Sequence, residues 1–136
     1  GPERDAGLLA GMVYLEKGNH PEAMFRIRAA VDSSPENVGN LATLAYAYAA
    51  EGKRDDAIRT LNALTERSKG TYIEPGWVAM VWVALGNSDR AMELLERDYQ
   101  LHSSFLMFVG SYPAFAPLHA KPQFRSLMHR VGLPVG

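Results

Sequence analysis

Apolar and polar residues follow a pattern along this chain that recurs three times. A glycine followed five residues later by an alanine stands at Gly18, Gly52 and Gly86, so successive copies are 34 residues apart. Each glycine follows an aromatic residue by four positions, and each alanine precedes an aliphatic residue by four positions; these residues are Tyr14, Tyr48 and Trp82, and Ile27, Leu61 and Leu95. A fixed period of this length is typical of stacked helical hairpins that bury their apolar sides against one another. The pattern predicts an all-α fold.

The period places three predicted hairpins at residues 4–37, 38–70 and 71–103. Each hairpin consists of two helices joined by the turn at the repeated glycine. In the first hairpin, the small residues Gly11 and Ala23 would let the two helices approach each other closely.

Two places in the repeated part carry a more specific prediction. Between the first and second hairpins, the stretch from Ser33 to Glu36 predicts an N-cap and a proline at the first position of the next helix. Near the end of the third hairpin, Asp98 stands where the earlier hairpins have Ala30 and Leu64. Because terminal repeats meet water or a different element, we interpret this departure as an atypical last repeat.

The tail, residues 104–136, is different in kind. An apolar run around Phe105 predicts a short buried helix, and the prolines that follow it predict an irregular linker. A last helix, Lys121 to Val131, would bury apolar residues at helical spacing. We expect these C-terminal helices to cap the third hairpin. At the other end, residues 1–3 form a lead-in, and Gly1-Pro2 is typical of the scar left when a tag is removed from an excised module.

The repeated part resembles the tetratricopeptide repeat family over residues 4–103. The first hairpin agrees with the consensus of that family at Gly11, Tyr14, Gly18, Ala23, Ile27, Ala30 and Pro35. The other two hairpins agree at Tyr48, Gly52, Ala57 and Leu61, and at Trp82, Gly86, Ala91 and Leu95. The resemblance implies a right-handed superhelix of three repeats, in which the first helix of each repeat faces a concave groove.

The tail carries a second resemblance. Its stretches 113–118 and 121–124, followed by Gly132-Leu133-Pro134, are similar to a C-terminal ending of bacterial proteins. In those proteins the repeats follow a winged-helix regulator, a nucleotide cyclase or a protein kinase domain. The resemblance implies a C-terminal sensing or assembly module of a larger bacterial regulator.

Composition narrows the classes of partner. The net charge is −1, and no long basic or acidic block is present, so we expect no direct contact with nucleic acid and no attraction to an anionic membrane. The chain has no cysteine, which excludes disulfides and leaves the compartment open. The longest apolar runs are too short to span a bilayer. We expect a cytoplasmic module, with the periplasm as the alternative.

Candidate chemistry is sparse. The four histidines, His20, His102, His119 and His129, form no pair at helical spacing, so we expect no metal site. The chain has no Gly-x-Ser-x-Gly elbow and no glycine-rich phosphate loop. The sequence therefore predicts no catalytic residues and no cofactor.

The predicted groove gives the candidate binding site. The non-consensus positions that would point into it include Leu8, Met12, Thr43, Tyr46, Trp77, Met80 and Val83. This predicted lining holds no lysine or arginine, so the basic clamp with which some family members hold an acidic peptide terminus is missing. An apolar groove with methionine, tyrosine and tryptophan is typical of a protein-binding surface.

Several occupants of that groove stay open at this point. A foreign peptide such as an amphipathic helix, the tail of the chain itself, and a second copy in a homodimer all fit an apolar surface. We therefore predict a non-catalytic module for protein–protein interaction or oligomerisation. The alternative is a sensory domain that binds a small apolar ligand in the groove and regulates an attached effector domain.

Overall fold

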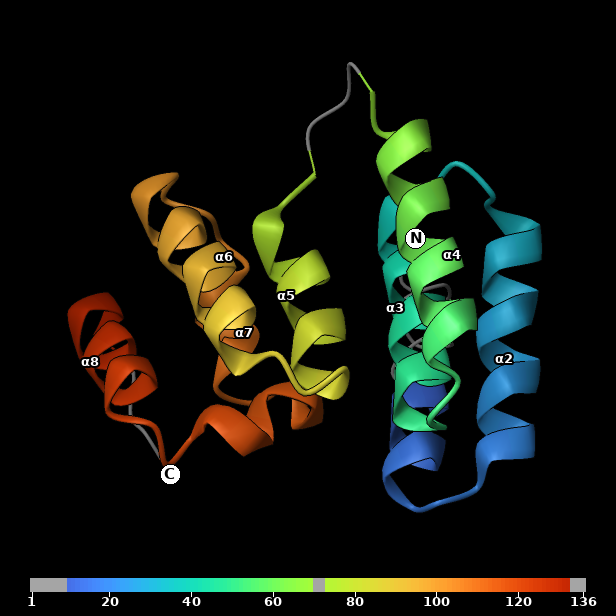
Figure 1. The fold of residues 1–136 in the computed structure, drawn as a ribbon, viewed down its shortest axis with the longest axis horizontal. Coiled ribbons are helices and arrows are strands. Elements are labelled where there is room, and N and C mark those ends of the chain that lie inside the picture. Colours follow the sequence, from blue (N-terminus) through green and yellow to red (C-terminus); the bar gives the residue numbers. More distant parts are fainter. Residues whose placement is uncertain (1–9, 70–72, 133–136) are drawn as a thin grey trace. The chain divides into compact units, whose positions relative to one another are not determined.

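The computed structural model describes residues 10–69 and 73–132 of the chain. In these ranges every regular element is a helix, which confirms the predicted all-α fold (Figure 1). The first helix occupies residues 10–16 of the described chain. It is followed by α2 (His20–Ser33), α3 (Val38–Ala50), α4 (Arg54–Arg67), α5 (Pro75–Ala84), α6 (Ser88–Gln100), α7 (Leu106–Val109), the 3-10 helix η1 (Pro113–Leu118) and α8 (Pro122–Val131).

The chain divides into two compact units, Gly1–Ile73 and Glu74–Gly136, which we call the first and the second unit. The first unit contains two helical hairpins, helix 10–16 with α2 and α3 with α4. The second unit contains the third hairpin, α5 with α6, and the tail. The superhelix that the resemblance implies depends on how the two units are joined, and it stays a prediction.

The three hairpin turns are built alike. Gly18, Gly52 and Gly86 all have a left-handed backbone, with φ of 81°, 81° and 85°. This conformation ends a helix at little cost only for glycine, because no Cβ meets the preceding turn. In the first and third hairpins an asparagine follows directly, and its side chain caps the next helix: Asn19 accepts from the Glu22 N–H, and Asn87 accepts from the Arg90 N–H.

The second hairpin begins near residue 38, as predicted, but the predicted N-cap and first-position proline are wrong. The N-cap of α3 is Asn37, whose side-chain oxygen accepts from the Asn40 N–H at 3.2 Å. Ser34 instead ends α2, where its backbone N–H donates to the carbonyl of Ala30 at 3.1 Å. Pro35 therefore lies between the two helices rather than at the first position of the second.

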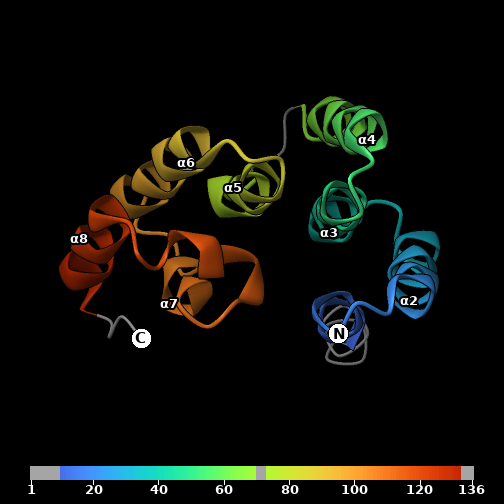
Figure 2. The same cartoon turned by 60° about the horizontal axis from the view of Figure 1, so that its bottom comes forward.

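The tail caps the third hairpin, as predicted. Within the second unit, η1 packs on α5 and α8 packs on α6 (Figure 2). The apolar side chains of Phe115, Leu118, Phe124 and Leu127 are fully buried there. The stretch expected to be an irregular linker is regular over Pro113–Leu118, because its two prolines fit the tight turns of a 3-10 helix.

Candidate functional site

Helix 10–16 and α3 of the first unit carry three of the seven predicted site residues, and we call these two helices the inner layer. Figure 2 shows helix 10–16 and α3 in one layer of this unit, with α2 and α4 in the other. Leu15, Ala23, Ile27 and Ala47 form a buried cluster that joins helix 10–16, α2 and α3. Helix 10–16 approaches α2 so closely that a Cβ on Gly11 would lie 2.7 Å from Cγ1 of Ile27. Small residues thus set the spacing of the layers, as predicted.

The predicted site residues of the first unit differ in exposure. Met12 is only 6% exposed, and Thr43 is fully buried with its hydroxyl donating to the Gly39 carbonyl at 2.9 Å. These two side chains belong to the core, so the expectation that they line an open groove does not hold. Tyr46 keeps part of its surface exposed. Leu8 lies outside the described residues.

Tyr46 lies near a carboxylate on this inner layer. Burial raises the pKa of the Tyr46 phenol, and the charge of Glu16 raises it further. The phenol therefore stays protonated at neutral pH and can donate a hydrogen bond, while the exposed Glu16 carboxylate can accept one. An aromatic ring with a donor and an acceptor beside it is the kind of surface that protein interfaces favour.

In the second unit the tail packs on the corresponding face of α5, where Trp77 keeps part of its surface exposed. Trp77 meets the ring of Phe105 edge to face, with 5.1 Å between ring centroids. Met80 is fully buried, and Val83 is 7% exposed. Of the occupants that the sequence left open, the tail of the chain itself therefore covers α5.

Phe105 is the centre of an aromatic cluster. Its ring also meets those of Tyr112 and Phe115 edge to face, at centroid distances of 5.6 and 6.1 Å. This geometry places the positive edge of one ring against the negative face of the next, which stabilises each pair beyond the apolar area it buries. The cluster ties the beginning of the tail to the N-terminal end of α5.

A buried carboxylate lies beside this cluster. A Cβ on Gly76 would lie under 3.0 Å from two ring carbons of Phe105 and from Oδ2 of Asp98, so Gly76 leaves the space that both groups use. Asp98 is fully buried, and neither of its carboxylate oxygens makes a well-formed hydrogen bond within the described residues, although the Gly76 N–H and the Ser103 hydroxyl lie close to the carboxylate. Burial raises the pKa of Asp98 to about 6, the Glu74 charge adds to this, and the Gly76 N–H and the Ser103 hydroxyl oppose it.

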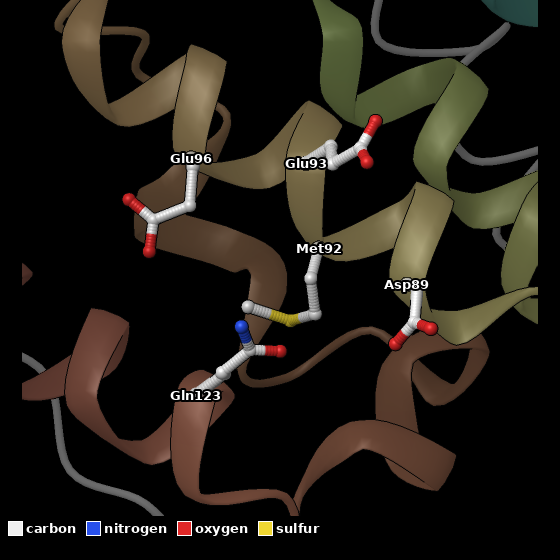
Figure 3. Close-up of a pocket in the computed structure, with 5 residues that line it drawn as sticks. All are labelled: Asp89, Met92, Glu93, Glu96 and Gln123. Carbon is white, nitrogen blue, oxygen red and sulfur yellow. The ribbon is translucent and has the colours of Figure 1, made fainter.

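A pocket of about 530 Å³ lies between α6 and α8 (Figure 3). Asp89, Glu93 and Glu96 of α6 contribute carboxylates to it, while Met92 and Gln123 approach each other across it. At one edge, Arg130 of α8 donates to Glu96 at 3.0 Å. Sequence analysis did not single out this pocket, because its acidic residues have the spacing of an ordinary solvated helix face.

The histidines take part in packing and surface contacts. Nδ1 of His20 lies 3.6 Å from Oε1 of Glu51, and the ring of His119 stacks on Phe124 with 5.3 Å between centroids. Within residues 10–69 and 73–132, no three acidic or histidine side chains come together as a metal site. None of the helices described is both long enough and apolar enough to span a membrane.

A comparison with protein-family models finds a match over the first two hairpins. Residues 14–73 match the family model of the tetratricopeptide repeat. This segment belongs to the tetratricopeptide repeat family. A comparison with curated proteins and one with solved structures found no match.

The tetratricopeptide match covers most of the first unit and ends just before the third hairpin. That hairpin keeps the register of the repeats at Trp82, Gly86 and Ala91, and its two helices pair like those of the first unit. Its departures from the pattern lie at Gly76 and Asp98, the two residues that accommodate Phe105 of the tail. The departure at Asp98 was visible as a charged residue at a packing position, but its partner across the space was not.

Proposed function

We propose that this chain is a non-catalytic interaction module that binds a protein partner, or a second copy of itself, through the inner layer of its first unit. Tetratricopeptide repeats generally mediate protein–protein interaction, and residues 14–73 are such repeats. The observation that carries the proposal is the difference between the two units. The α5 face is occupied by the tail, whereas the partly exposed Tyr46 lies beside an exposed carboxylate on the inner layer.

The proposal extends to the parent protein. We propose that the module is the cytoplasmic, C-terminal part of a larger bacterial regulator. The similarity of residues 113–118 and 121–124 to the endings of such proteins supports this, and so does the capping role of these residues. The alternative, a sensor for a small apolar ligand, gains no support from the pocket between α6 and α8, because three carboxylates line it.

The first test is the solution mass, measured by light scattering over a wide range of protein concentration. If the partner is a second copy, the wild-type protein forms a dimer as concentration rises, and Tyr46→Ala remains a monomer. Phe25→Ser is the matched control, because Phe25 is 71% exposed on α2 and lies outside the inner layer. The control should dimerise like the wild type; loss of the dimer in Phe25→Ser alone would refute the inner layer as the interface.

If the wild-type protein is a monomer at every concentration, a foreign partner is tested directly. An array of amphipathic helical peptides is probed with the wild type, Tyr46→Ala and Phe25→Ser. We expect at least one peptide that binds the wild type and the control but not Tyr46→Ala. Equal binding of all three proteins to every peptide would refute the proposed site.

A further inference from the structure

The beginning of the tail, residues 104–118, packs on α5, and we call this segment the lid. We propose that a neutral carboxylate at Asp98 keeps the lid closed on α5, and that a charge on this carboxylate raises the fraction of molecules in which the lid has opened. The opened lid would uncover Trp77. The opening of the lid needs no partner. Only the binding of a partner to the uncovered face of α5 rests on the proposed function.

Apolar contacts dominate the lid's attachment to α5. The ring of Phe105 fills the space left by Gly76 and meets Trp77, while Tyr112 and Phe115 support it from the lid side. Residues 101–120 contain no aspartate, glutamate, lysine or arginine. No salt bridge with a lid carboxylate or ammonium can therefore hold the lid closed, and its hold depends on the apolar surface it buries.

Closure traps Asp98 in a place that suits only its neutral form. The carboxylate is fully buried and its two oxygens make no well-formed hydrogen bond in the described part of the chain, so the nearby Gly76 N–H and Ser103 hydroxyl compensate its charge only in part. The groups that face it are the Gly76 N–H on α5, the Ser103 hydroxyl at the base of the lid, and Glu74, whose negative charge repels it. Removing Phe105 from Gly76 would let water reach the charge.

The size of the effect follows from linkage. With the lid closed, the pKa of Asp98 is about 6; a solvated carboxyl has the usual value of 3.8. The ratio of closed to open molecules therefore falls by about a hundredfold as pH rises through this interval. Below the lower value this hundredfold contribution to the closed form is fully present, and it is lost as pH rises through the upper value.

The connection between α6 and the lid is short. His102 has a left-handed backbone with φ of 55°, and it lies between the end of α6 and Ser103. The Ser103 N–H donates to the Asp98 carbonyl at 3.0 Å, and the Phe105 N–H donates to the Ser103 hydroxyl at 3.2 Å. The backbone of Asp98 and the lid are thus linked through Ser103, and the short connection of residues 101–103 is the place where a hinge would act.

Hydrogen exchange of backbone amides tests the lid, because it detects open states of low population. Protection factors, corrected for the intrinsic effect of pH, are measured from about pH 3 to about pH 8, a range that brackets both pKa values of Asp98. We expect the lid amide of Phe115, which donates to the Tyr112 carbonyl at 3.0 Å, to lose about a hundredfold in protection as pH rises. Amides in the middle of α6 should lose less than the lid amides do.

Two variants make the test specific. Asp98→Asn keeps the size of the side chain without the charge, so its lid protection should be high and independent of pH. Asp89→Asn removes an exposed carboxylate from the same helix and should behave like the wild type. The same loss in Asp98→Asn, a flat profile in the wild type, or an equal loss in the lid and α6 would each overturn the lid. None of these outcomes involves a partner, so the lid can be refuted without affecting the interaction site that Tyr46→Ala tests.

Discussion

Gly76→Ala is the sharpest test of the packing between α5 and the tail. The new Cβ would lie under 3.0 Å from two ring carbons of Phe105 and from Oδ2 of Asp98. The ring cannot turn away freely, because Trp77, Tyr112 and Phe115 surround it. The substitution therefore forces either the ring or the buried carboxylate out of place.

Two opposing effects determine how much Gly76→Ala changes the free energy of unfolding. Overpacking a tight site costs about 1–3 kcal/mol, and the two displaced groups place Gly76→Ala at the upper end of this range. Replacing glycine by alanine inside a helix returns at most about 1 kcal/mol. We expect the free energy of unfolding of the second unit to fall by about 2 kcal/mol.

Urea unfolding followed by tryptophan fluorescence measures this change. Both tryptophans, Trp77 and Trp82, lie on α5, so their signal reports the second unit, while circular dichroism reports the whole chain. Gly11→Ala is the control, since its Cβ would meet the side chain of Ile27 in the first unit and should leave the tryptophan transition unchanged. A tryptophan midpoint that is unchanged or higher in Gly76→Ala would refute the packing of Phe105 on Gly76.

Two further predictions concern stability. The pKa of Asp98 is raised by folding from 3.8 to about 6, so its stabilising contribution is present below the lower value and lost as pH rises through the upper one. At about pH 8 the free energy of unfolding of Asp98→Asn should therefore exceed that of the wild type by up to about 3 kcal/mol, and at about pH 4 the two should be similar. Urea titration followed by tryptophan fluorescence measures both values; no increase at the higher pH would contradict this prediction. Asn87→Ala removes the cap of α6 and should cost about 1 kcal/mol in the same assay, whereas Asn87→Asp should retain most of the stability.

The sequence predicted the hairpins well because the information for them is local. The turn at Gly52 needs a glycine for its left-handed backbone, and Ala57 and Leu61, which follow it at fixed spacing, are buried. A period of 34 residues repeats this information three times. The cap of α3 was misplaced, because Asn37 competes with the serine–proline signal at Ser34 and only the packed structure decides between them.

The candidate site was less predictable. Whether Met12 and Thr43 face a groove or the core depends on how closely neighbouring helices approach, which is a property of the packed layers. The tail was expected to cap the third hairpin, yet its exact position on Trp77 depends on a space that Gly76 leaves and that no periodicity reveals. Tyr46 is the predicted residue of the first unit that keeps exposed surface in the described structure.

The glycines of the three hairpin turns also carry a consequence for chirality. At Gly18, Gly52 and Gly86, an added Cβ would meet nothing within 4 Å, so only the sign of φ restricts these positions. A D-amino acid prefers this sign of φ, and it has fewer conformations than glycine in the unfolded chain. Each turn is thus a place where the handedness of a single residue, rather than any contact it makes, decides whether the hairpin is stabilised or strained.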